Sequence, residues 1–194
     1  MKRTKVHTIK IRDIELEYSV DYRKVKYTRY ELKNGKLFLI LPKRSKVNIE
    51  ETIHKKDKWI YRKIMEYNKE NEILSDKTKD MDLIQRSMPE LRDLVSIYVE
   101  KYEKILNVKV NRIQFRDTLY KWGSCSSLRN ITLSKNLRFI PDRLVEYIVY
   151  HELTHIIVLA HDDKFFEIIK REFPNYTLCD EKLKEYNFLI ENRF

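Results

Sequence analysis

The chain has 194 residues, of which 42% are hydrophobic and 12% aromatic. This composition excludes a disordered tail and suits one folded domain, or one domain with a smaller appended layer. Forty basic residues against 30 acidic ones give a formal net charge of +10, which favours contact with polyanions. The basic clusters MKRTK and PKRSK are short, however, and are equally typical of solvated surface. Nucleic acid is therefore only weakly indicated as a partner.

Cysteine content and apolar runs indicate the compartment. Cys125 and Cys179 are too few for a disulfide framework and do not form a C-x-x-C pair, which favours a reducing environment. The N-terminal region has no continuous apolar segment of the kind found in signal peptides. No run approaches the ~18 apolar residues of a membrane span. We therefore expect a soluble, cytoplasmic protein without membrane contact.

The first half of the chain begins with alternating apolar and polar residues, as in strands. Asn34 and Gly35, which both accept a positive φ, lie between two alternating segments and predict a hairpin. We expect an antiparallel sheet, and then a helix from about Asn48 to Asn68. The polar stretch KENEILSDKTKD that follows is the expected internal boundary. The sequence thus predicts a β-rich region over residues 1–70, with one helix, packed on a catalytic domain over residues 80–194.

The second half is mainly helical. Apolar residues step by four and three from Ile84 to Ile105, and Ser87 with Glu90 fits a capping box near the start of that helix. The further expected elements are strands in VKVNRIQFRD and RNITLS, and helices over Asp142 to about Val158, in DDKFFEIIKREF and in EKLKEYNFLIE. The predicted fold class is α+β, with a β-rich N-terminal part and a helical C-terminal part.

One five-residue motif in the helix that begins at Asp142 has the spacing of a metal site. His151, Glu152 and His155 form H-E-x-x-H, and residues four apart on a helix project from the same face, so both imidazoles can bind one metal ion. Glu152 lies about 100° round the helix, where it can act as general base on a water held by the metal. Its burial in an apolar helix would be costly without a nearby cation.

The third ligand is expected further along the chain. A catalytic zinc has three protein ligands and one open position, and His161 is the best remaining candidate. On a continuous helix His161 would point about 120° away from His155, so the helix should end near Leu159, with Asp162 or Asp163 capping a new one. Zinc is preferred over Ni, Cu or Fe(II), which imidazole also suits. Satisfaction of the histidines by hydrogen bonds alone is the less favoured alternative.

Beyond the motif, the segments KWGSCSSLRNITLSKNLRFIP, VEYIVYHELTH and HDDKFFEIIKREFPNY resemble the YgjP-like metallopeptidase family, which is related to the SprT-like and WLM groups. The strong resemblance covers about Tyr120 to Tyr176. It implies a zincin-like metallopeptidase domain, metal binding by His151, His155 and His161, and a catalytic role for Glu152. The metzincin pattern is excluded, because it needs Gly where this chain has Val158.

Substrate-binding candidates are Trp122, Gly123 and Ser124, together with Asn130 and Thr132 of the following strand. A loop and an edge strand at the rim of a cleft could pair with an extended peptide. The equally weighted alternative is structural, with Trp122 packed on the active-site helix and Gly123 in a turn.

Other side chains near the motif have less defined roles. With three histidines available, Cys125 is expected to be a buried small hydrophobe and not a ligand. Tyr147, Tyr150 and Tyr176 are all candidates for stabilising an oxyanion, and the sequence does not choose among them.

Together these patterns predict a zinc-dependent metallopeptidase that hydrolyses peptide bonds with a metal-activated water and Glu152 as general base. One alternative, from the SprT-like resemblance and the charge, is a protease acting on nucleic-acid-bound proteins. The other is a basic binding module with a structural metal, which would need a fourth protein ligand and would leave Glu152 without a task.

Overall fold

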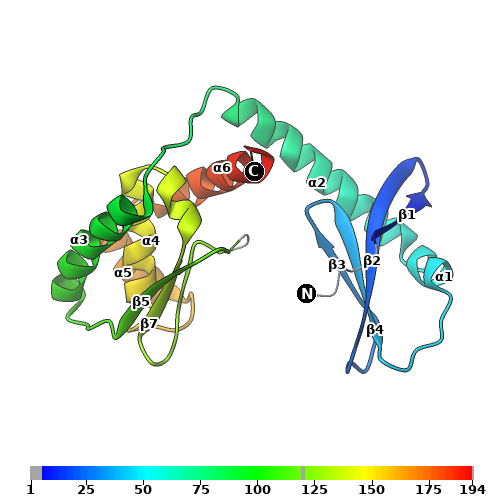
Figure 1. Cartoon of the computed structure of the whole chain (residues 1–194), viewed down its shortest axis with the longest axis horizontal. Coiled ribbons are helices and arrows are strands. Elements are labelled where there is room, and N and C mark those ends of the chain that lie inside the picture. The colour runs from blue at the N-terminus through cyan, green and yellow to red at the C-terminus, as the bar shows by residue number, and fades with distance from the viewer. Residues whose placement is uncertain (1–5, 119–120, 194) are drawn as a thin grey trace. The chain divides into compact units, whose positions relative to one another are not determined.

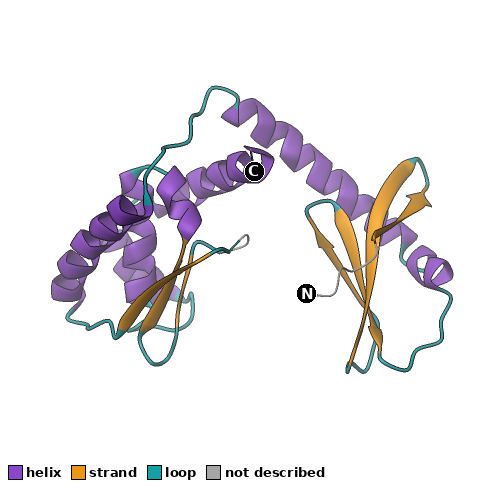
Figure 2. Ribbon diagram, in the orientation of Figure 1, coloured by secondary structure: helices purple, strands orange, loops and turns teal. Residues whose placement is uncertain are grey.

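A computed structural model describes residues 6–118 and 121–193 of the chain. The basic segment MKRTK and Tyr120, where the family resemblance begins, lie outside the described residues. The fold is α+β, with a β-rich N-terminal part and a helical C-terminal part, as predicted (Figure 2). The chain divides into two compact units, Met1–Asp76 and Lys77–Phe194. Among the described residues, no helix combines the length and apolarity needed to cross a bilayer.

The first unit contains a four-stranded sheet in the order β1-β2-β4-β3 (Figure 1). Its strands are β1 (Val6–Ile11), β2 (Ile14–Arg23), β3 (Arg29–Lys33) and β4 (Lys36–Pro42). Asn34 and Gly35 have φ values of 50° and 70° and join β3 to β4, which confirms the predicted hairpin. The expectation of a purely antiparallel sheet is wrong, because β2 and β4 pair in parallel. β4 is a nearly continuous apolar run, which belongs in the interior of a sheet and not at its edge.

Two helices complete the first unit, α1 (Ile49–His54) and α2 (Asp57–Thr78). Ile53, Ile60 and Ile64 join one face of the sheet in a single apolar core. The single helix predicted over this region is therefore two helices, and α2 continues to Thr78 through most of the predicted polar boundary. That stretch contains neither Gly nor Pro, so nothing in it ends a helix. The proposed domain limits, and the packing of one region on the other, stay predictions.

The second unit begins with α3 (Met88–Leu106), whose capping box is formed as predicted: the Ser87 amide donates to Glu90 Oε2 over 2.7 Å, and the Glu90 amide donates to Ser87 Oγ. A three-stranded sheet follows, in the order β5-β7-β6. Its strands are β5 (Arg112–Arg116), β6 (Gly123–Cys125) and β7 (Asn130–Ser134). The remaining helices are a 3₁₀ turn η1 (Lys135–Phe139), α4 (Asp142–Thr154), α5 (Asp163–Glu172) and α6 (Tyr176–Arg193).

Helix α4 forms the centre of this unit. Every residue from Leu144 to Tyr150 is buried, and α4 packs against α3, α5, α6 and β6. Packing on all sides holds the middle of α4 in a fixed position. The side chains in its last turn therefore also have well-defined positions. That end carries the H-E-x-x-H motif.

Candidate metal centre

The last turn of α4 sets the direction of the motif. The helix ends at Thr154, four residues before the predicted Val158, and the chain tightens there into turns in which the amides of Ile156 and Ile157 donate to Leu153 O and Thr154 O. The expectation that the helix reaches the neighbourhood of Leu159 is therefore wrong. The earlier end gives the chain more residues in which to turn back. Asp162 then caps α5 by accepting from the Phe165 amide over 3.0 Å, as one of the two predicted caps.

The turn brings three histidines together. One ring nitrogen from each of His151, His155 and His161 lies within 4.8 Å of the other two, and the Nε2 atoms of His151 and His161 are 3.0 Å apart. His155 Nδ1 lies 3.1 Å from Val158 O. Because a carbonyl oxygen only accepts, Nδ1 must carry the proton, and Nε2 of a neutral His155 then keeps its lone pair. This is the tautomer that a metal-binding histidine needs.

Burial keeps the imidazoles of His151 and His155 uncharged. It lowers the pKa of His151 to about 3, and the neighbouring His155 and His161 add to the effect. Burial also lowers the pKa of His155, against the opposing effect of its bond to Val158 O. Metal coordination requires neutral histidine, so at neutral pH both rings are in the binding form without a proton having to leave.

Glu152 is 5% exposed, and among the described residues its Oε2 has no hydrogen-bond partner. Burial raises its pKa to about 8, and the charge of Lys121 opposes this shift. An isolated buried carboxylate is costly, and a cation nearby removes that cost. Three imidazoles and a carboxylate oxygen that has no partner among the described residues, all at one cavity, are the donor set that a divalent cation fits.

Strand β6 forms the opposite wall of this site. A Cβ atom placed on Gly123 would lie 2.5 Å from Glu152 Oε1 and 2.7 Å from its Cγ. Real Cβ atoms do not approach other atoms so closely, so only glycine allows β6 to pack against the carboxylate. A cavity of about 290 Å³ opens at this site, and its lining includes the three histidines, Glu152, Gly123, Ser124 and Cys125.

Comparison with known proteins identifies the unit that carries this site. A sequence model described as "YgjP-like, metallopeptidase domain" matches residues 76–186, more than half of the chain. The chain belongs to the YgjP-like metallopeptidase family. Among solved structures, the metallopeptidase zymogen abylysin of Pyrococcus abyssi is similar with a TM-score of 0.43 and 20% identity, over 46% of this chain and 90% of that one. No curated protein gives a significant match.

Within the YgjP-like domain, the structure separates the five predicted substrate-binding residues. Gly123 and Ser124 line the cavity, whereas Trp122 is half-buried against the core. The expectation that strand 130–134 is an edge strand is wrong, because β7 is the central strand of its sheet. Asn130 accepts a hydrogen bond from Asn111, just before β5, and Thr132 accepts one from Gln114 of β5; neither is among the residues that line the cavity. The edge strands of the described sheet are β5 and β6, and the residues of β6 line the cavity.

The three tyrosines proposed for the oxyanion also lie outside the cavity lining. The Tyr147 hydroxyl donates to Asp180 Oδ1 over 2.8 Å, and the Tyr150 hydroxyl donates to Ile168 O over 3.0 Å. The Tyr176 ring stacks on Phe166. Cys125 is half-buried at the cavity wall, where burial and then the charge of Glu152 raise its thiol pKa. A raised pKa makes a thiol a poor nucleophile at neutral pH.

Sequence reasoning missed a ring that supports all three histidines. Phe165 is fully buried at the start of α5, and its centroid lies 4.9, 4.7 and 4.7 Å from those of His151, His155 and His161. Phe165 lies three residues after the Asp162 cap, where the apolar face of α5 begins. Its burial beneath the histidines could have been predicted from that position. Lys121 and Leu159 were also missed, and both line the cavity.

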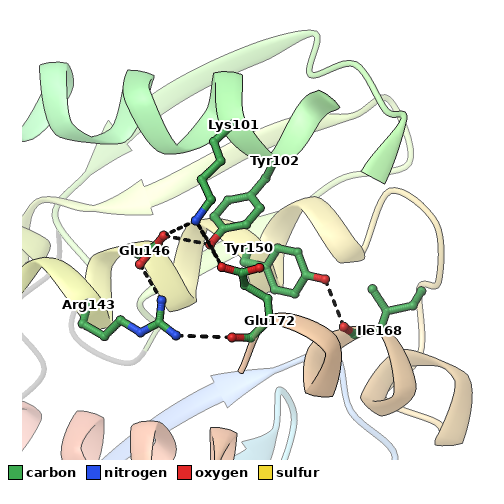
Figure 3. Close-up of polar contacts among 7 residues, drawn as sticks. All are labelled: Lys101, Tyr102, Arg143, Glu146, Tyr150, Ile168 and Glu172. Carbon is green, nitrogen blue, oxygen red and sulfur yellow. Dashed lines mark hydrogen bonds and ion pairs between the residues drawn. The ribbon is translucent and has the colours of Figure 1, made fainter. Parts of the chain in front are cut away.

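A partly buried polar network joins α4 to the helices on either side (Figure 3). Glu146 Oε1 accepts from Lys101 Nζ and from the Tyr102 hydroxyl, each over 2.8 Å, and Glu146 Oε2 accepts from Arg143 over 2.7 Å. The Tyr102 hydroxyl also lies 2.9 Å from Glu172 Oε1 at the end of α5. The network thereby fixes α5 against α3 and α4, and α5 carries Phe165 to the histidines.

Proposed function

We propose that this YgjP-like protein is a zinc-dependent peptidase in which His151, His155 and His161 hold the ion and Glu152 is the general base. The observation that carries the proposal is the convergence of three imidazoles beside a buried carboxylate oxygen that has no partner among the described residues. The donor set suits zinc, which binds imidazole nitrogen readily and commonly uses three protein ligands at catalytic sites.

The number of ligands argues against a structural metal. Structural zinc sites usually have four protein ligands and favour cysteine. In the described part of the chain, the group that could hold an ion contains three histidines and no fourth side chain. A position left open for solvent, next to an unpaired carboxylate, is the arrangement that hydrolysis requires.

When bound, zinc would lower the pKa of a coordinated water to about 7 and polarise the carbonyl under attack. The protein's own part is proton transfer and positioning. Glu152 Oε2, which has no partner among the described residues, takes the proton from the attacking water and returns it to the amine of the departing peptide. Gly123 keeps the carboxylate in place on one side, and the bond from His155 to Val158 O fixes the ring on the other.

The substrate we propose is an extended peptide that adds to the free edge of β6. β6 is the terminal strand of its described sheet, and Gly123, Ser124 and Cys125 line the same cavity as Glu152. A strand added at that edge would satisfy the unpaired backbone groups of β6 and would pass directly over the site. Recognition of this kind depends on main-chain bonds, so it tolerates many peptide sequences.

The test combines elemental analysis with cleavage of a peptide library by purified wild type, Glu152→Gln and His161→Ala. We expect Glu152→Gln to keep its zinc and to lose about 10²- to 10⁴-fold in rate, because the amide has the shape of the carboxylate but cannot take a proton. His161→Ala should lose zinc. Glu167→Gln, the same change at an exposed position on α5, is the control and should keep both metal and rate.

Three results would contradict parts of the proposal. Full activity in Glu152→Gln would exclude this residue as the base. Zinc bound at wild-type stoichiometry by His161→Ala would remove that residue from the ligand set. Zinc without cleavage of any peptide by the wild type would leave the metal centre in place and refute the peptidase reaction.

A further inference from the structure

The positive charge of the chain is concentrated outside the metallopeptidase match. Residues 1–76 contain 20 of the 40 basic residues but only 12 of the 30 acidic ones, which gives the first unit a formal net charge of +8. Residues 77–194 contain the other 20 basic and 18 acidic residues, a net charge of +2. The two units therefore differ in the partners that their surfaces attract.

Parallel pairing in the first sheet brings two basic loops to the same end. β2 and β4 run in the same direction, with Arg23 opposite Pro42, so the segments that follow them leave the sheet side by side (Figure 1). Counted with the strand residues that adjoin them, these segments are YRKVKYTR at residues 22–29 and PKRSKVN at residues 42–48. Together they contain seven basic residues and no acidic one. We call these two segments the basic end of the sheet.

Charges at the basic end differ from those along the strands. On the strands, Lys33 pairs with Glu31 and Lys36 pairs with Glu17, each over 2.7 Å. Of the seven basic residues at the basic end, only Arg23 forms an ion pair within the described part of the chain. The exposed lysines among the others are Lys24, Lys26, Lys43 and Lys46. Unpaired cations close together repel one another, and phosphates would relieve that repulsion.

Aromatic rings are exposed at the same place. Tyr22 is 47% and Tyr27 is 69% exposed, although tyrosine normally buries most of its ring. The Lys26 ammonium lies 5.1 Å from the centre of the Tyr27 ring. Exposed aromatic rings among cations form stacking platforms for unpaired bases, whose faces are accessible in single strands and covered in a duplex.

From these observations we infer that the basic end of the sheet binds single-stranded nucleic acid, with its lysines on the phosphates and Tyr27 stacked on a base. This interaction lies outside the metal centre and does not depend on peptidase activity. The sequence alone conceals it, because PKRSK and YRKVKYTR are separate short clusters until β2 and β4 pair in parallel.

The test is fluorescence anisotropy of a labelled oligothymidine and of an RNA of the same length with the full chain over a series of salt concentrations. We expect binding that weakens with salt. Lys26→Glu/Lys43→Glu/Lys46→Glu should weaken it by about 10-fold or more and should reduce the salt slope by about 2, since each phosphate contact on a single strand contributes about 0.7. The matched control is Lys104→Glu/Lys170→Glu/Lys184→Glu, three exposed lysines of the second unit, which should bind as wild type.

A second pair of variants tests stacking separately from charge. Tyr27→Ala should weaken binding by about 10-fold, whereas Tyr27→Phe should retain it, because the ring and not the hydroxyl carries the contact. A duplex of the same length should bind less tightly than the single strand.

Four outcomes would overturn the inference. These are no oligonucleotide binding by the wild type at low salt, equal losses in the two triple variants, equal affinity for duplex and single strand, and binding to phosphatidylserine vesicles without binding to oligonucleotides. The last would identify an anionic bilayer as the partner. Thermal melting of each variant separates a binding defect from unfolding.

Discussion

Gly123→Ala should disable the site without touching a ligand. Its new Cβ would lie 2.5 Å from Glu152 Oε1, whereas ordinary contacts begin near 3.4 Å, so the carboxylate must move by about 0.9 Å. A catalytic group misplaced by about 1 Å costs about 10²-fold in rate. Overpacking of this kind also costs about 1–3 kcal/mol of unfolding free energy. The three histidines lie on other segments, so zinc content should not change.

The measurements are peptide-cleavage rates, zinc content and urea unfolding of the same preparations. The second glycine of the chain provides a matched control, since a Cβ on Gly35 would lie 2.9 Å from Tyr67 Cε1 at a φ of 70°. Gly35→Ala should lower stability by about 1 kcal/mol or more, because alanine is strained at positive φ, and should leave cleavage unchanged. Wild-type cleavage by Gly123→Ala would refute the reasoning, as would a loss of zinc in that variant.

Three further predictions concern the support of the site. Phe165→Ala should leave a cavity beside all three imidazoles and lower the unfolding free energy by about 3–5 kcal/mol. It should also weaken zinc binding, measured by equilibrium dialysis. Unchanged zinc affinity would contradict this prediction. Burial alone raises the pKa of Glu146, but three hydrogen bonds, from Lys101 foremost, outweigh it and hold the pKa below its ordinary 4.5. The stability that Glu146 supplies is therefore present at neutral pH and lost as the pH falls through that lowered value, and Glu146→Gln should flatten the acid side of the urea-unfolding profile. Zinc at a thousandfold its Kd should stabilise the wild type by about 4 kcal/mol in calorimetry, and His161→Ala by clearly less.

Features set by a few neighbouring residues could be predicted from the sequence. The Asn34-Gly35 turn, the Ser87 capping box and the Asp162 cap each depend on residues within one turn of the chain, and all three are formed. The proximity of His151 and His155 follows in the same way from helix geometry. His161 could be brought to them only by supposing that the helix ends, and the structure ends it earlier than the apolar pattern suggests.

Features set by distant pairing could not be predicted. Nothing in β2 or β4 alone specifies that they run in parallel, because register and direction depend on which partner buries the apolar run of β4. β6 has only three residues, too few for an alternating pattern, so the sequence points to the neighbouring β7 as the edge strand. Both features depend on which strands lie next to each other in the sheet, and the second changes which residues can bind an extended peptide.

The environment of Glu152, whose Oε2 has no partner among the described residues, depends both on neighbouring residues in the sequence and on the pairing of distant strands. Local helix geometry places the carboxylate beside His151 and His155, but only the pairing of β6 with β7 brings Gly123 against it. Any larger residue at position 123 would occupy the space of the carboxylate, and a polar one could satisfy Oε2 and remove its capacity to accept a proton from water. An unsatisfied buried oxygen costs about 1–3 kcal/mol of stability. If stability were the only requirement, a residue at position 123 that hydrogen-bonds Oε2 would therefore be favoured over glycine. The chain bears that cost at the position where the proposed mechanism needs a free carboxylate oxygen.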